Sequence, residues 1–117
     1  MIKKIIEDQQ KICQKYSAEF SPVEMDSLIG ISDNTNGVYM PINGLRHPQE
    51  GNTSGWYIWS GELLSKEDNF FKPKHTKHLI DRCPQILKFL ALPPGYRFLV
   101  GENGYIDVWY DSSLLSA

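Results

Sequence analysis

Gly55-Trp56-Tyr57-Ile58-Trp59-Ser60-Gly61-Glu62 decides the fold of this chain, because the stretch places three large aromatic side chains within four positions. Side chains on a strand alternate between its two faces, so Trp56 and Ile58 share one face while Tyr57 and Trp59 share the other. A strand that is apolar on both faces is typical of the centre of a sheet. We therefore expect a helix to cover one face, and loops, a partner or a ligand to cover the other.

The length and composition fit a single globular domain over residues 1–117. Of the 117 residues, 41% are apolar and 22% are charged, which is enough to bury a core without metal or disulfide cross-links. The formal net charge of -2 gives no general attraction to nucleic acid or to an anionic membrane surface, so we expect neither partner. The chain has no apolar run of membrane-spanning length, and its first residues turn acidic where a signal peptide would stay apolar. These features predict a cytoplasmic protein.

The pattern along the chain predicts an α+β domain with a mostly antiparallel sheet of about five strands. An amphipathic helix is expected over about residues 1–20, with its apolar stripe packed on the sheet. The stripe contains Ile2, Ile5, Ile6, Ile12, Cys13, Tyr16 and Phe20. A second helix, from about His75 to Cys83, is expected between strands three and four.

The expected strands are the aromatic stretch and the segments 28–32, 38–42, 96–100 and 105–110. Asn36-Gly37 predicts a tight hairpin between the first two of these segments. Pro41 lacks an N–H group, which favours a position at the edge of the sheet or an irregular strand end. The connection 43–54 contains Arg46 and His47 and is expected to be a long loop, a kind of segment that often carries function.

Metal binding and catalysis find little support in the residue spacing. His75 and His78 are three apart on a predicted helix, but no third ligand stands at a matching position, and nearby lysines would repel a cation. Cys13 and Cys83 are expected to be reduced thiols in the core, and neither lies beside a histidine in the sequence. The chain also lacks a nucleophile elbow, a Walker loop and a dinucleotide fingerprint. We therefore predict no metal, no cofactor and no catalytic residue.

Carboxylates beside aromatic residues leave two further possibilities open. Glu62, Asp107 and Asp111 could contribute to a sugar-binding or acid/base site. Asp107 is, however, expected to pair with Arg97 across the last hairpin. Four aromatic residues could stack on bases, but their strands lack the positive groove that usually accompanies such a platform. They are Tyr57, Trp59, Tyr105 and Trp109. Tryptophan, tyrosine and arginine side chains are also the types that dominate protein–protein hot spots.

Four segments together resemble a known family of small bacterial proteins. They are Gly44-Leu45-Arg46-His47-Pro48, Gly51-Asn52-Thr53-Ser54 continuing through Glu62, Leu92-Pro93-Pro94-Gly95-Tyr96-Arg97-Phe98, and Asp107-Val108-Trp109-Tyr110-Asp111. This series resembles immunity proteins of polymorphic toxin systems, of the immunity-protein-33 type. The resemblance covers most of the chain from about Leu28 onward and leaves residues 1–20 outside. It implies a cytoplasmic antidote that binds a cognate toxin and blocks it without chemistry of its own.

The leading hypothesis is therefore a non-enzymatic immunity protein that inhibits a toxin domain by occlusion. Seven side chains are predicted to bind the partner: Arg46, His47, Tyr57, Trp59, Glu62, Asp107 and Trp109. An alternative is a small-molecule or carbohydrate-binding module that uses the same aromatic surface, and a third possibility is a single-strand nucleic-acid binder. The sequence leaves the oligomeric state open.

Overall fold

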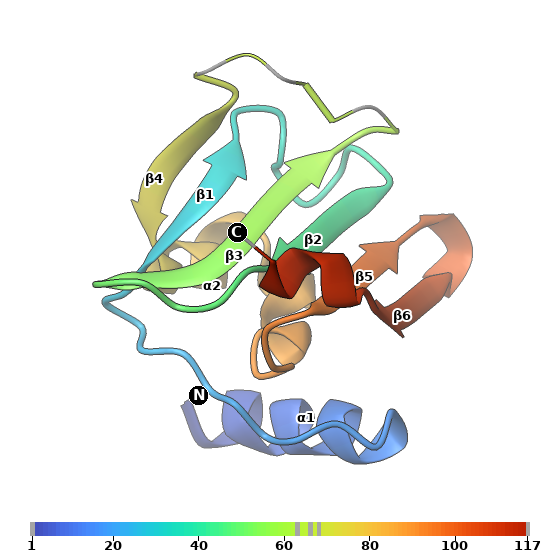
Figure 1. The fold of residues 1–117 in the computed structure, drawn as a ribbon. Coiled ribbons are helices and arrows are strands. Elements are labelled where there is room, and N and C mark those ends of the chain that lie inside the picture. The colour runs from blue at the N-terminus through green and yellow to red at the C-terminus, as the bar shows by residue number, and fades with distance from the viewer. Residues whose placement is uncertain (1, 63, 66, 68, 117) are drawn as a thin grey trace.

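The computed structural model describes residues 2–62, 64–65, 67 and 69–116, and its centre is a sheet in the order β4-β1-β3-β2-β5-β6 (Figure 1). The strands are β1 (Leu28–Ser32), β2 (Ile42–Arg46), β3 (Thr53–Ser60), β4 (Phe71–His75), β5 (Tyr96–Val100) and β6 (Ile106–Tyr110). The α-helices are α1 (Ile2–Lys15) and α2 (Leu79–Arg82). Short 3-10 segments are η1 (Thr76–His78), η2 (Pro84–Phe89), η3 (Glu102–Gly104) and η4 (Ser112–Leu115).

The predicted α+β class is confirmed, with one strand more than the expected five. Segment 71–75 is not among the five expected strands, and it forms strand β4, which pairs antiparallel with β1. The short α2 therefore follows the fourth strand and not the third. All strand pairs are antiparallel except β1 with β3. The sheet is thus mostly antiparallel, with one internal parallel pair.

The predicted hairpin between segments 28–32 and 38–42 is wrong. The side-chain oxygen of Asn36 accepts hydrogen bonds from the backbone N–H groups of Val38 and Tyr39, so the chain turns locally and does not enter a strand. Strand β2 begins only at Ile42 and lies inside the sheet, between β3 and β5. The sequence pattern hides this strand because it contains an asparagine and a glycine, which are depleted in strands.

The aromatic strand is central in the sheet, as predicted. β3 lies between β1 and β2, and its inward side chains Trp56 and Ile58 are only 1% and 0% exposed. The indole Nε1 of Trp56 donates a 3.0 Å hydrogen bond to the carbonyl of Leu90, behind the sheet. Gly44 of β2 leaves room on this face for Phe98, because a Cβ on Gly44 would overlap the phenylalanine ring. The main core therefore lies between the sheet and the segment from α2 to η2.

Helix α1 packs on η2 and not directly on the sheet (Figure 1). Its buried residues are Ile5, Gln9 and Cys13, and the side-chain amide of Gln9 donates a 2.9 Å hydrogen bond to the carbonyl of Leu87 in η2. Ile2 and Ile6 from the predicted apolar stripe are instead half-exposed. The helix therefore forms an outer layer, which corrects the expectation of direct packing on the sheet.

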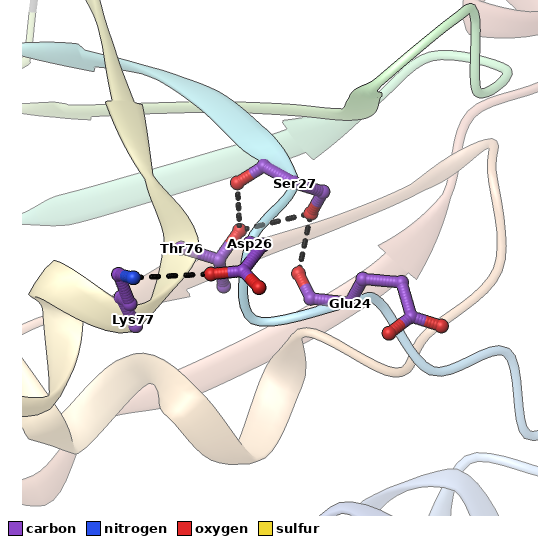
Figure 2. Close-up of polar contacts among 5 residues, drawn as sticks. All are labelled: Glu24, Asp26, Ser27, Thr76 and Lys77. Carbon is purple, nitrogen blue, oxygen red and sulfur yellow. Dashed lines mark hydrogen bonds and ion pairs between the residues drawn. The ribbon is translucent and has the colours of Figure 1, made fainter.

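A polar cluster joins the segment before β1 to the start of η1 (Figure 2). Thr76 donates from its backbone N–H and from its hydroxyl to the carbonyl of Ser27, at 2.8 and 3.0 Å. The hydroxyl of Ser27 donates to the carbonyl of Glu24 at 2.6 Å, and Lys77 forms a 3.1 Å ion pair with Asp26. Because Ser27 and Thr76 are both buried, these bonds fix the end of the β1–β4 pair.

Candidate partner-binding face

The face of the sheet opposite the main core is called the outer face here, and two adjacent rows of side chains cross it. The first row contains Tyr57, Leu45, Arg97 and Trp109, from β3, β2, β5 and β6. The second row contains Trp59, Asn43, Leu99 and Asp107, from the same strands. Four of the seven predicted partner-binding residues therefore lie on one face: Tyr57, Trp59, Asp107 and Trp109.

The chain itself covers the middle of the outer face. Leu45, Trp59 and Leu114 form a second small core, against which Phe70 and Phe71 pack. Figure 1 shows η4, which carries Leu114, in front of the sheet. Trp59 is only 4% exposed as a result. The sequence left open whether loops, a partner or a ligand cover this face of the aromatic strand. Over Trp59 the cover is the C-terminal segment of the chain itself.

Tyr57 stays accessible at one side of this cover. Its side chain is 37% exposed, and its ring makes edge contacts with Phe71 and His47, with centroid distances of 5.1 and 5.6 Å. The Nδ1 atom of His47 lies 3.1 Å from the carbonyl oxygen of Leu114, so it must carry the proton to donate this bond. His47 and Tyr57 therefore form an exposed aromatic pair that η4 holds in place.

Trp109 is accessible at the other side, on the edge strand. Its ring is 36% exposed and lies under the guanidinium of Arg97, 5.3 Å from the ring centroid. Arg97 also forms a 3.2 Å ion pair with Asp111. The hydroxyl and backbone N–H of Ser113, followed by Arg97, lower the pKa of Asp111. These contacts hold an indole, a cation and a carboxylate together beside η4.

Asp107 does not pair with Arg97, which corrects the expectation from the hairpin. The strand register places Asp107 opposite Leu99 and places Arg97 opposite Trp109. The carboxylate of Asp107 is exposed, and the described residues form no ion pair with it. It is therefore available to a cation from outside.

Glu62 lies away from the other predicted residues. It follows the end of β3, where it borders a hollow with Tyr39 and Phe70. His47 lies near the start of β3, where its backbone N–H donates to the carbonyl of Gly55. The carboxylate of Glu62 is exposed. The structure thus brings His47 and Tyr57 together and leaves Glu62 at the far end of the same strand.

Arg46 belongs to β2 and not to an exposed loop, so its predicted placement is wrong. Its side chain points to the core face and is 1% exposed. It donates hydrogen bonds to the carbonyls of Ser21, Ser54 and Leu92, at 2.8, 3.0 and 2.8 Å. Burial lowers the pKa of Arg46 to about 10. The side chain therefore joins three segments of the chain and is not available to a partner.

The described residues contain no group of three or more His, Cys, Asp or Glu side chains that could hold a metal ion. Burial raises the pKa of Cys83 to about 11, and it also raises the pKa of Cys13, so both thiols are protonated and poorly nucleophilic near neutral pH. No helix in the described part of the chain is long and apolar enough to cross a membrane.

Sequence reasoning missed Arg97 and Leu114 as parts of the outer face. Arg97 was assigned to a cross-strand pair, but the hairpin register turns it toward Trp109 and Asp111. Leu114 covers Trp59 from a 3-10 turn near the end of the chain. The Asp111-Ser112-Ser113 sequence is the only local signal, since Asp111 accepts hydrogen bonds from Ser113 at the start of that turn.

Comparison with protein families now gives this geometry a context. A family model described as the Imm33-like domain matches residues 8–111. The chain belongs to the Imm33-like domain family. The Imm33-like match covers every strand from β1 to β6 and the later part of α1, so the rows of the outer face lie inside it. Neither a curated protein nor a solved structure matches this chain.

Proposed function

We propose that this protein is a non-enzymatic immunity protein, which binds a cognate bacterial toxin domain and inhibits it by occlusion. The observation that carries the proposal is the Imm33-like match over residues 8–111, because the name of the family denotes an immunity protein. The proposal places the complex in the cytoplasm of the producing cell.

The exposed part of the outer face is the proposed contact surface. Tyr57 and Trp109 are 37% and 36% exposed, and each ring is held by neighbours before a partner arrives, Tyr57 by Phe71 and Trp109 by Arg97. A fixed aromatic ring loses little conformational entropy on binding, which suits an anchor residue. Trp59 and Arg46 support this surface from within and are not proposed as direct contacts.

Charge gives the surface a preference for a basic partner. The side chains of Asp107, on the outer face, and of Glu62, beyond the end of β3, are exposed, and the chain carries a formal net charge of -2. Toxins that act on nucleic acids need positively charged active sites to hold phosphates. An acidic surface with aromatic anchors would bind such a site and exclude its substrate.

The decisive experiment is co-expression with the cognate toxin domain, followed by affinity purification and calorimetry. We expect a stoichiometric complex that removes toxin activity, and we expect the Tyr57→Ala/Trp109→Ala variant to bind at least about a hundredfold more weakly, from two hot-spot losses. A matched control is Tyr105→Ala, since Tyr105 is 58% exposed and lies outside β6, at the turn before it.

The two variants separate the function from the surface. If the parent chain neither binds nor inhibits the toxin domain, the immunity function is wrong. If the parent inhibits the toxin and the double variant inhibits it equally well, the function stands and the proposed contact surface is wrong. A thermal unfolding curve for each variant shows whether any loss of binding reflects loss of the fold.

A further inference from the structure

Strands β4 and β6 form the two edges of the sheet (Figure 1). Their backbones and side chains differ in what they offer to a further strand. An open edge presents a row of unpaired backbone N–H and C=O groups to any extended segment. Proteins usually block such edges with proline or lysine. Comparing the two edges therefore shows where a partner strand can add.

The β4 edge is blocked. The N–H of Thr76 bonds to the carbonyl of Ser27, and bonding pairs alternate along an antiparallel ladder. When this alternation is continued along the β1–β4 register, the backbone N–H and C=O groups of Lys72 and Lys74 point toward β1. Pro73, between them, occupies a position whose backbone groups point away from the sheet. Proline has no N–H to donate there. A strand approaching β4 would meet a missing donor flanked by two lysines.

The β6 edge is open. The N–H of Gly101 bonds to the carbonyl of Tyr105 at 2.9 Å, and the N–H of Asp111 bonds to the carbonyl of Gly95 at 2.7 Å. With the β5–β6 register, these two flanking bonds assign the inward positions to Asp107 and Trp109. The N–H and C=O groups of residues 106, 108 and 110 therefore point away from the sheet. The register therefore gives these three N–H groups no acceptor on β5, and the loop bonds of the described residues include none for them.

The side chains of β6 select what could pair with it. On the core side, Ile106 and Val108 are partly buried and pack against the main core, so apolar residues of an added strand would extend that core. On the outer face, the exposed Asp107 lies next to Trp109. A cation opposite Asp107 and an apolar residue opposite Trp109 would complement this face.

A second copy of this chain fits the edge poorly. Antiparallel self-pairing centred on Asp107 places the two Asp107 carboxylates opposite each other, and pairing centred on Trp109 places Asp107 opposite Asp111. Pairing centred on Val108 leaves the two Asp107 residues as diagonal neighbours on the same face. Like charges directly opposite each other destabilise a strand pair, which disfavours the first two registers. In the third register, Asp107 faces Trp109 of the other copy and gains no cation.

We propose that β6 is the site where an extended segment of the toxin domain adds to the sheet as a further strand, with a lysine or arginine opposite Asp107. The inference rests on the proposed function and specifies how the partner binds. Backbone bonds to residues 106, 108 and 110 supply affinity, while Asp107 and Trp109 supply selectivity. The exposed Trp109 anchors this strand on the outer face.

The first measurement is amide hydrogen exchange by NMR on the free protein. We expect the amides of Ile106, Val108 and Tyr110 to exchange at least about tenfold faster than those of Asp107 and Trp109. Only the N–H groups of Asp107 and Trp109 donate hydrogen bonds to β5. In the complex with the toxin domain that co-purifies with the parent chain, the three fast amides should become protected. Protection of all five amides in the free monomer, or no gain of protection in the complex, would overturn the inference.

The second measurement compares Val108→Pro with Val108→Ala. Proline removes the central outward N–H, whereas alanine keeps that N–H and loses the side chain, so the pair separates edge pairing from core packing. We expect Val108→Pro to bind the toxin domain at least about tenfold more weakly than Val108→Ala, with both variants folded by circular dichroism. Equal binding by the two variants would refute the strand addition.

The remaining outcomes distinguish this inference from the proposed function. If the parent retains no toxin domain, the immunity function fails and the partner of β6 fails with it. If the parent binds and the two Val108 variants bind equally, only the edge inference fails. If light scattering shows a dimer of the free chain that Val108→Pro dissociates, the occupant is a second copy and the proposed partner at β6 is wrong.

Discussion

Gly30 of β1 lies directly beneath the ring of Tyr57 on the neighbouring strand β3, so closely that a Cβ on Gly30 would be 2.7 Å from the ring carbon Cδ1. The absence of a side chain lets Tyr57 lean across β1 and reach Phe71 on β4. We expect Gly30→Ala to displace the ring and to destabilise the fold by about 1–3 kcal/mol through overpacking. Urea unfolding of the variant measures this cost.

The same substitution in a Tyr57→Ala background is the control. Removing the ring should remove most of the overlap, so Gly30→Ala should then cost less than about 1 kcal/mol. An equal cost in both backgrounds would show that the strain arises elsewhere, for example against Phe71.

The two outer-face tryptophans should differ in their effects on stability. Trp59 is 4% exposed inside the second small core, whereas Trp109 is 36% exposed at the edge. We expect Trp59→Ala to lower the free energy of unfolding by about 3–5 kcal/mol and Trp109→Ala to lower it by about 1 kcal/mol or less. Chemical denaturation of both variants tests the assignment. A stable Trp59→Ala protein that fails to bind the toxin domain would return Trp59 to the contact surface.

Arg46 should act on stability and not directly on binding. Its guanidinium bonds to the carbonyls of three separate segments, so Arg46→Ala should cost at least about 3 kcal/mol. Arg46→Lys keeps the charge but loses the planar guanidinium that reaches several acceptors. Its free energy of unfolding should therefore lie between those of the parent and Arg46→Ala. Thermal unfolding and toxin affinity are measured together. Normal stability with lost affinity would contradict the structural role.

Cys83 should make stability depend on alkaline pH. Burial raises the pKa of this thiol from 9.0 to about 11 in the folded protein, so the unfolded chain loses the proton first. The contribution of the neutral thiol to the free energy of unfolding is complete below pH 9. It is lost as the pH rises from 9 to about 11, and the loss is on the order of 2–3 kcal/mol in total. Urea unfolding at pH 8 and pH 10.5 measures the loss.

Cys83→Ala separates this effect from other groups that titrate at high pH. The lysines, the tyrosines and Cys13 are the same in the parent and in Cys83→Ala. A difference between the two proteins in the slope of unfolding free energy against pH therefore belongs to Cys83. Parallel slopes in the parent and in Cys83→Ala would show that the thiol does not carry the dependence.

The parts of the fold that follow local rules could be predicted from the sequence. The aromatic alternation around Trp56 and Trp59 predicted a central strand that is covered on both faces, and β3 has this position. The β5–β6 hairpin was predicted from its two alternating segments and the glycine-containing turn between them. In both cases the signal lies within one strand or one turn, where side-chain period and turn chemistry decide the outcome.

The errors arose where distant residues decide the structure. β4 contains a proline and two lysines, a composition that reads as a loop unless the strand lies at an edge, and β1 supplies its partner from far away in the sequence. Arg46 looked like a loop residue because an isolated arginine is rarely buried, and its three acceptors lie on other segments. The contact surface itself remains a proposal, since no local pattern shows which exposed aromatic meets a partner.

The placement of β1 has a consequence for how fast the protein reaches its native state. β1 has no neighbour in sequence order beside it, since it pairs with β3 on one side and with β4 on the other. The β2–β3 and β5–β6 pairs connect segments that follow one another along the chain, and they can form early at low cost in loop entropy. The β1–β3, β1–β4 and β2–β5 pairs join segments that lie further apart along the chain, so we expect them to form after the two hairpins. A sheet built in this way becomes complete only after β5 and β6, near the end of the chain, have left the ribosome.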